Sequence, residues 1–206
     1  MSVMTKPAPT QATFAMSDHE FLEFAPERKA ELIGGEFIVA SPASRGHERL
    51  FMFLATLLNT YVRHHNLGEV FGSRTAVRLG VSGEVYEPDI CFVRRERSGL
   101  ITPTYIDGPP DLAVEILSRS TQHDDRTVKK AGYEQAGVAE YWLIHPERPL
   151  AEFYRLTGVS YSLVLPDEEG IFRSQAVPGF WLKPAWFWPD VGNPNPLPAL
   201  RELGVI

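Results

Sequence analysis

A carboxylate in the middle of an apolar run is the first feature of this sequence that suggests chemistry. Glu115 lies within Leu112-Ala113-Val114-Glu115-Ile116-Leu117, a run typical of a buried strand in an α/β sheet. A buried carboxylate without a partner takes up a proton or binds a cation. Asp111 shares the strand face of Glu115 but lies about 13 Å away along an extended chain. A second carboxylate for a metal site must therefore come from another segment.

The sequence Glu87-Pro88-Asp89 supplies a second carboxylate, because Asp89 directly precedes the apolar run 90–93. If this run forms the strand beside that of Glu115, the two carboxylates converge on one point. Two carboxylates at one point repel each other, which raises at least one pKa unless a hard divalent cation such as Mg²⁺ lies between them. The alternatives are a simple turn at Pro88-Asp89 and an arginine partner for Glu115.

A lysine on the following helix adds a cation to this pair. Asp125, Lys129 and Tyr133 are spaced four residues apart, so they share one helix face. One interpretation is an ordinary ion pair between Asp125 and Lys129, worth ~0.3–0.5 kcal/mol. The other is an ammonium group directed at the two carboxylates, where it orients a water nucleophile or stabilises a pentavalent phosphate.

These residues belong to an ordered set of short motifs that covers most of residues 17–187. The motifs are Glu31-Leu32-Ile33-Gly34-Gly35-Glu36, Arg45-Gly46-His47, Glu87-Pro88-Asp89, the run 110–118, Asp125 with Lys129 and Tyr133, and the run 137–144. The set resembles the PD-(D/E)XK nuclease superfamily, which has the restriction-endonuclease-like fold, and within it the Uma-type family of restriction endonucleases. This chain departs from the superfamily at one position. The usual lysine of the superfamily lies two residues after the acidic residue of the strand, and this chain has Leu117 there.

The resemblance implies an Mg²⁺-dependent endonuclease that hydrolyses phosphodiester bonds in DNA, with Mn²⁺ as a substitute metal. It implies that Asp89 and Glu115 hold the metal and that Glu31 is a further ligand, although a surface ion pair at a hairpin is equally open for Glu31. It puts the catalytic lysine on the helix at Lys129. Lys130, about 100° around the helix, is the fallback.

Basic residues predict where nucleic acid would lie. Between residues 45 and 80, five arginines stand against two acidic residues, and this local excess favours phosphate contacts; residues 94–97 are the second choice. Neither stretch interleaves aromatic residues in the way that a base-stacking platform would, so we infer no sequence preference. His47, at the start of a long helix, is a phosphate contact or a helix-start contact. The predicted nucleic-acid contacts are Arg45, His47, Arg49, Arg74, Arg78 and Lys130.

Composition bounds the class of protein. The chain has 206 residues, 44% of them hydrophobic, which suffices for one domain with a substantial core. A net charge of -6 argues against a protein that mainly coats nucleic acid, but not against a nuclease with clustered carboxylates. Cys91 is the only cysteine, which is consistent with a reducing cytoplasm. No signal peptide or membrane span is expected.

Periodicity and turn residues predict the elements that position these side chains. We expect a short helix after a capping box at Ser17-Asp18-His19-Glu20, a Gly-Gly hairpin over 30–39, and a long helix over 47–66. Extended segments are expected over 69–80 and 85–93, a strand over 112–117, a helix over 123–136 and a strand over 139–146. Short antiparallel strands are expected over 150–156, 159–165 and 171–177, followed by an irregular Pro-rich segment over 189–198.

The sequence thus predicts an α/β protein with a restriction-endonuclease-like mixed sheet flanked by helices and an antiparallel C-terminal extension. Residues 1–13 form a disordered leader, 14–188 a single domain and 189–206 a Pro-rich tail. The rival to a nuclease is a non-catalytic nucleic-acid-binding or assembly protein that retains the fold. Hydrolysis of a different phosphoester, or other metal chemistry, is the third reading. We expect a cytoplasmic homodimer with no membrane partner.

Overall fold

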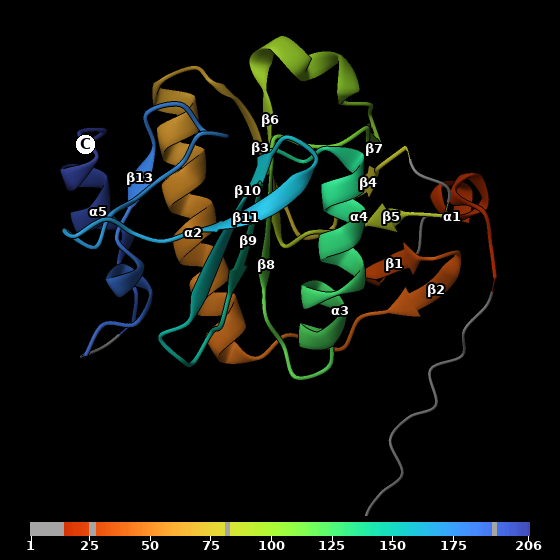
Figure 1. The fold of residues 1–206 in the computed structure, drawn as a ribbon, viewed down its shortest axis with the longest axis horizontal. Helices are drawn as coiled ribbons and strands as arrows, with labels where there is room; N and C mark the ends of the chain where they lie inside the picture. Colours follow the sequence, from red (N-terminus) through yellow and green to blue (C-terminus); the bar gives the residue numbers. More distant parts are fainter. Residues whose placement is uncertain (1–14, 25–27, 81–82, 191–192) are drawn as a thin grey trace, which may run out of the picture.

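Two β-sheets form the body of the protein. The structure, a computed structural model, describes residues 15–24, 28–80, 83–190 and 193–206, so the leader expected over 1–13 lies outside the described residues. The larger sheet has the strand order β11-β10-β9-β8-β6-β3, with β8 and β9 parallel and all other neighbours antiparallel. Its strands are β3 (Gly68–Gly72), β6 (Ile90–Arg94), β8 (Leu112–Ile116), β9 (Glu140–Ile144), β10 (Ala151–Thr157) and β11 (Ser160–Val164). Helices on both sides of this mixed sheet confirm the predicted α/β class (Figure 1).

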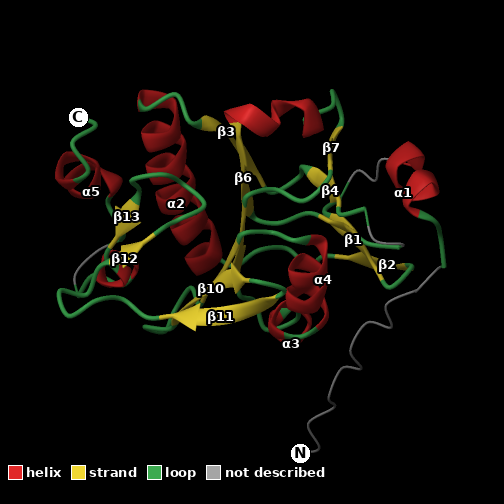
Figure 2. Cartoon of the chain, turned by 45° about the horizontal axis from the view of Figure 1, so that its top comes forward, coloured by secondary structure: helices red, strands yellow, loops and turns green. Residues whose placement is uncertain are grey.

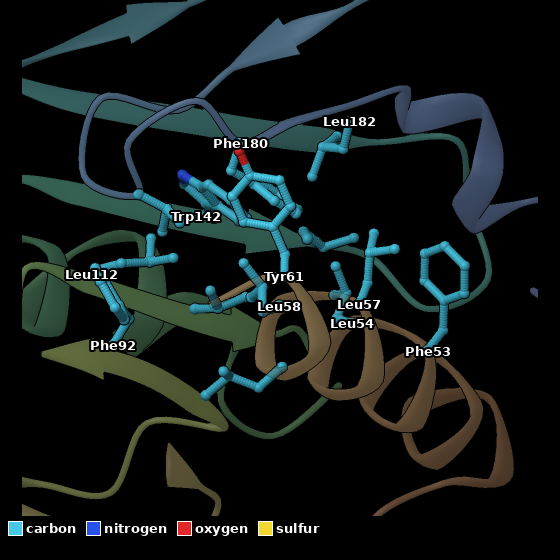
Figure 3. Packing of buried hydrophobic residues seen from close by; sticks show 14 of the residues in the cluster. Phe53, Leu54, Leu57, Leu58, Tyr61, Phe92, Leu112, Trp142, Phe180 and Leu182 are labelled. Carbon is cyan, nitrogen blue, oxygen red and sulfur yellow. The ribbon is translucent and has the colours of Figure 1, made fainter. Parts of the chain in front are cut away.

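The long helix α2 (Arg45–His64) covers one face of the larger sheet, as its periodicity predicted. Its N-cap is Ser44, whose hydroxyl accepts a hydrogen bond from the backbone N–H of His47 at 3.2 Å. The apolar stripe of α2 packs against inward-facing residues of the sheet and against C-terminal aromatics (Figure 3). Members of this core include Phe53, Leu57, Tyr61, Phe92, Leu112, Trp142 and Phe180.

The opposite face of the larger sheet is covered by α3 (Gln122–Arg126) and α4 (Val128–Ala136), where the sequence predicted one helix (Figure 2). The prediction of a continuous helix is wrong at Thr127, whose backbone is not helical (φ -118°, ψ -85°). The Thr127 hydroxyl donates to the carbonyl of His123 at 2.7 Å, a local bond that competes with helix geometry. Gly137 ends α4 in the left-handed conformation, as expected.

A second sheet of five strands, in the order β2-β1-β5-β4-β7, was not predicted. The extended segments expected over 69–80 and 85–93 are each divided between the two sheets. A turn in which Thr75 N–H bonds to the Gly72 carbonyl separates β3 from β4, and Pro88, which cannot donate to a ladder, separates β5 from β6. The strands are β1 (Ala30–Ile33), β2 (Glu36–Val39), β4 (Ala76–Arg78), β5 (Val85–Tyr86) and β7 (Tyr105–Asp107). The hairpin of β1 and β2 is confirmed; the turn expected at 81–84 lies partly outside the described residues.

The C-terminal region differs from its prediction in two places. The strand expected over 171–177 is only β12 (Phe172–Arg173), which pairs with β13 (Trp181–Leu182) in a separate two-stranded sheet. The segment expected to be irregular up to Pro198 contains the start of α5 (Pro196–Glu202). Proline fits the first turn of a helix, whose N–H groups have no intrahelical partner, and Asn195 caps it. Ala199 and Leu200 of α5 join the core against α2.

The remaining helices are short. In α1 (Asp18–Phe24) the predicted capping box is confirmed, because Ser17 N–H donates to the Glu20 carboxylate and Glu20 N–H donates to the Ser17 hydroxyl. The 3₁₀ helices are η1 (Arg95–Leu100) and η2 (Pro184–Phe187). Within the described residues, no helix is both long and apolar enough to cross a membrane.

Candidate active site at the junction of the two sheets

Asp89 directly precedes β6, and Glu115 lies on the neighbouring strand β8. In the antiparallel pair β6–β8, Ile90 is the first residue of β6 and is opposite Val114. Asp89, one residue before β6, therefore lies near the level of Glu115, and its Oδ2 accepts from the N–H of Ile116. The strand adjacency expected from the sequence is confirmed. Asp111 directly precedes β8, away from Glu115 as expected, and contacts Arg97 at 3.0 Å.

Three donors hold the carboxylate of Asp89. Lys29 Nζ lies 2.6 Å from Oδ1, while His47 Nε2 at 3.0 Å and the backbone N–H of Ile116 at 2.8 Å both reach Oδ2. Burial opposes the charged carboxylate, but Lys29 and His47 outweigh that effect and hold the pKa of Asp89 below its ordinary value. Asp89 is therefore a fixed anion. His47, predicted as a phosphate contact or a helix-start contact, also contacts this acid.

Lys129 lies at the centre of three other carboxylates. Its Nζ is 2.5 Å from Glu115 Oε1, 2.9 Å from Glu31 Oε1 and 3.3 Å from Asp125 Oδ1, and its side chain is 3% exposed. Burial alone would lower the pKa of a lysine, but the three carboxylates raise the pKa of Lys129 well above its ordinary value. Lys129 was expected to point at both Asp89 and Glu115. Its contact with Glu115 is confirmed and Asp125 helps to hold it as expected, but the lysine that contacts Asp89 is Lys29.

Glu115 and Glu31 complete the cluster. Glu115 Oε1 also accepts from the Tyr133 hydroxyl at 3.1 Å, and Glu31 Oε1 accepts from the backbone N–H of Glu87 at 2.9 Å. Burial, aided by the nearby carboxylates of Asp125 and Glu31, raises the pKa of Glu115 to about 8 even though Lys129 opposes the change. The carboxylates outnumber the ammonium groups, so the cluster favours uptake of a proton or of another cation.

A cavity of about 590 Å³ opens onto this cluster. It collects side chains from β1, the start of α2, the β3–β4 turn, β8 and α4, and so lies where the two sheets meet. Its lining includes Lys29, Glu31, His47, Arg74, Asp89, Glu115 and Lys129. Of the predicted nucleic-acid contacts, only His47 and Arg74 line it.

The other predicted nucleic-acid contacts lie elsewhere. Arg45 and Arg49 line a second cavity of about 640 Å³ at the start of α2, together with Trp188 from the C-terminal region. Arg78 pairs with Asp107 at 2.6 Å and lies over the ring of Tyr105. Lys130 lies over the ring of Tyr154, with 3.9 Å between Nζ and the ring centroid.

The donor set fits a hard divalent cation. Among the described residues, no three His, Cys, Asp or Glu side chains are already grouped to hold a metal ion, since lysines occupy the space between the acids. When ionised, Glu31, Asp89, Glu115 and Asp125 carry two more charges than Lys29 and Lys129 offset, and their oxygens are the ligands that Mg²⁺ prefers. One divalent cation would balance that excess.

Sequence reasoning missed Lys29 and the role of Tyr133. Lys29 is 60 residues from Asp89 in the chain, and no local pattern marks it. Tyr133 was placed on the helix face of Lys129 without a contact to Glu115; its ring is buried in the core, and its hydroxyl donates to Glu115. Its place one turn after Lys129 was the available signal, because residues four apart share a helix face.

Comparison with known proteins identifies the family and the fold. The Uma2 family, described as "Putative restriction endonuclease", matches residues 17–185 of the chain. Among solved structures, the crystal structure of a "putative nuclease belonging to DUF820" from Anabaena variabilis matches with a TM-score of 0.68 and 20% sequence identity. That match covers 84% of this chain and 97% of the other, and at this identity it shows the fold alone. No curated protein matches the chain.

Proposed function

The chain belongs to the Uma2 family, and from this membership we propose that it is an Mg²⁺-dependent endonuclease that hydrolyses phosphodiester bonds in DNA, with Mn²⁺ as a substitute metal. The observation that supports this proposal most is the placement of Asp89 near the level of Glu115, with Lys129 against Glu115, at the floor of an open cavity. Two acids and a lysine at one point are the groups that metal-assisted phosphoryl transfer needs.

Each side chain of the site has a part in this reaction. Asp89 and Glu115 would hold the metal, with Glu31 as a further ligand. A bound divalent cation lowers the pKa of its water and offsets charge on the scissile phosphate. Lys129 supplies a fixed positive charge beside Glu115, where the attacking water and the developing phosphate charge need it. The Tyr133 hydroxyl and the N–H of Ile116 hold the two acids in place.

We propose that the nucleic acid backbone runs from the site cavity across the start of α2. Arg74 lies at one end of this path, and Arg45 and Arg49 line the neighbouring cavity at the other end. Arg45 and Arg49 are exposed, and phosphate contacts of this kind do not depend on base sequence. The pairing of Arg78 with Asp107 argues against a phosphate contact there.

The proposed setting is a cytoplasmic homodimer. A single buried cysteine, Cys91, is typical of proteins from a reducing compartment. The half-buried rings of Trp181 and Trp186 supply apolar surface for a second copy. Light scattering at micromolar concentration tests the dimer, and a monomer mass would remove it.

A non-catalytic protein that retains the fold is the second candidate. The observation that favours it is the pairing of Asp89 with Lys29 and of Glu115 with Lys129, because ion pairs of this kind also stabilise a fold without any metal. Such a protein would bind nucleic acid or a partner through the same surfaces and leave the phosphodiester bond intact.

Cleavage of supercoiled plasmid separates these candidates. We expect the wild-type protein to nick or linearise the plasmid with Mg²⁺ or Mn²⁺, and Asp89→Ala to leave it intact. Asp111→Ala is a matched control, because Asp111 is also a buried acid on this sheet but pairs with Arg97 away from the cavity. Equal cutting by wild type and Asp89→Ala would indicate a contaminant, and no cutting by wild type would favour the binding protein. Chelation of the metal should abolish cutting, and the same assay with RNA or a non-nucleic phosphoester defines the substrate class.

A further inference from the structure

The two lysines of the site have very different surroundings. Lys129 Nζ lies within 3.3 Å of three carboxylates and its side chain is 3% exposed, so its ammonium is enclosed by the site. The Lys29 side chain is 24% exposed and lines the open cavity. Among the described residues, its ammonium forms an ion pair with a single group, Asp89. Of the two, Lys29 has the greater freedom to move.

Lys29 occupies the one oxygen of Asp89 that a metal would need. Oδ2 already accepts from the Ile116 N–H and faces the imidazole of His47, which leaves Oδ1 as the oxygen turned to an incoming cation. Lys29 Nζ lies 2.6 Å from that Oδ1. An ammonium and a divalent cation on one oxygen would repel each other strongly, so the two compete for it.

The backbone of Lys29 is held by a hydrogen bond that does not involve its side chain. The Lys29 carbonyl accepts from the N–H of Ala40 at 2.9 Å, which ties the residue to the end of the β1–β2 hairpin. A lysine side chain has a flexible four-carbon stem and three donors, so its ammonium can exchange one anion for another within reach. The nearest anion that the proposed reaction brings into this cavity is a substrate phosphate.

We propose that Lys29 is an exchangeable cation of the site: it holds Asp89 Oδ1 in the metal-free protein and moves to a non-bridging phosphate oxygen of the substrate when a divalent cation takes its place. This inference rests on the metal site of the proposed function. It assigns substrate contact to Lys29 and leaves Lys129 as the fixed charge beside Glu115. No bond is made or broken in the exchange.

Manganese affinity tests the competition without any turnover. In calorimetric titrations with Mn²⁺ alone, we expect Lys29→Gln to bind the metal at least about tenfold more tightly than wild type, since a competing charge next to Asp89 is gone. Lys29→Arg keeps the charge and should stay near wild type. Arg28→Gln is the matched control, because it removes one positive charge from an exposed neighbour that also lines the cavity. Equal or weaker Mn²⁺ binding by Lys29→Gln than by Arg28→Gln overturns the proposal.

A labelling experiment on the wild-type chain tests the movement even if the variants do not fold. The Lys29 amine should be acetylated more slowly without metal, when it pairs with Asp89, and faster with saturating Mg²⁺, as read by mass spectrometry. Lys183, which pairs with Glu202 far from the site in sequence, should show no change. Metal binding that leaves the acetylation rate of Lys29 unchanged overturns the exchange alone. No metal binding by wild type or variants overturns both the exchange and the proposed function.

Discussion

Gly132 of α4 lies directly against Tyr86 of β5. A Cβ atom at position 132 would come 2.3 Å from the Tyr86 hydroxyl oxygen and 3.0 Å from two carbons of its ring. No real side chain tolerates such contacts, so the close approach of α4 to the five-stranded sheet depends on glycine here. Gly132 is three residues after Lys129, and this approach brings the lysine to within reach of Glu31 on β1.

Gly132→Ala should therefore destabilise the protein and weaken the site. Alanine gains ~1 kcal/mol in helix propensity, but overpacking against a rigid ring costs about 1–3 kcal/mol and pushes α4 outward. Denaturant unfolding measures the loss, and cleavage rate reports the displaced lysine. Gly132→Ala combined with Tyr86→Phe should recover part of the stability, because the hydroxyl with the shortest contact is gone. A single Gly132→Ala variant more stable than wild type would contradict this account.

Lys129→Ala should lower both stability and turnover. Removal of the ammonium leaves Glu31, Glu115 and Asp125 buried without their cation, which costs about 3–5 kcal/mol in the free energy of unfolding. The cleavage rate should also fall, because the transition state would lose about 2.7–4 kcal/mol of stabilisation, as for other preorganised donors. Lys130→Ala, which loses only a contact over Tyr154, serves as the control for stability. Equal unfolding free energies for the two variants would show that Lys129 is not the counter-charge of the cluster.

Glu87 should make the protein less stable as the pH rises. Its Oε2 is buried with no hydrogen-bond partner among the described residues, and burial raises the pKa of Glu87 from 4.5 to about 7, although Arg74 opposes the change. Between these values the folded protein binds more protons than the unfolded chain, so the free energy of unfolding falls as pH rises. Urea unfolding of metal-free protein across this window should show the decline. Glu87→Gln should show a smaller decline, and identical slopes would rule out Glu87 as its source.

The salt dependence of DNA binding should separate the arginines. If Arg45 and Arg49 each neutralise one phosphate, each change to Gln should lower the slope of log affinity against log salt by about 0.9. Arg78→Gln should leave the slope unchanged, because its guanidinium pairs with Asp107. Fluorescence anisotropy with a labelled duplex, in chelator to prevent cleavage, measures all three. A change for Arg78→Gln alone would move the nucleic-acid path to the five-stranded sheet.

The C-terminal helix should contribute to the stability of the whole domain. Leu200 is 3% exposed in the core against α2, whereas Leu197 of the same helix is 51% exposed. Leu200→Ala should lower the free energy of unfolding by about 2–5 kcal/mol. Leu197→Ala should change it by no more than about 0.5 kcal/mol. Thermal or denaturant unfolding compares them. Equal small effects would mean that residues 189–206 form a separate tail, as the sequence suggested.

Local patterns predicted the elements well where their signals lie within one segment. The apolar periodicity of α2, the capping box of Ser17 and Glu20, and the buried strand around Glu115 each depend on neighbours a few residues away. Such patterns could not predict that each extended segment contributes a strand to both sheets. That division depends on pairing with distant strands, of β4 with β7 and of β3 with β6. The helix at Pro196 was missed because prolines were taken as breakers, although two of them lie in its first turn.

The same distinction holds for the site. Asp89, Glu115 and Lys129 were identified by motif order and by helix spacing, and the structure brings them together. No local sequence pattern marks Lys29, because its role in the site depends on its contact with Asp89, 60 residues away. The sequence also gave no sign that Trp188 approaches Arg45 and Arg49, because a cavity formed by distant segments has no pattern along the chain.

The site lies on a seam, and this position has a mechanical consequence. Glu31 belongs to the five-stranded sheet, Glu115 belongs to the six-stranded sheet, and Lys129 joins them from α4. A ligand that contacts residues of both sheets would hold the sheets at a fixed separation. Ligand affinity and the distance between the two sheets are therefore coupled. Substitutions elsewhere in either sheet that change this distance would thus change the ligand affinity of the site without replacing any of its acidic residues.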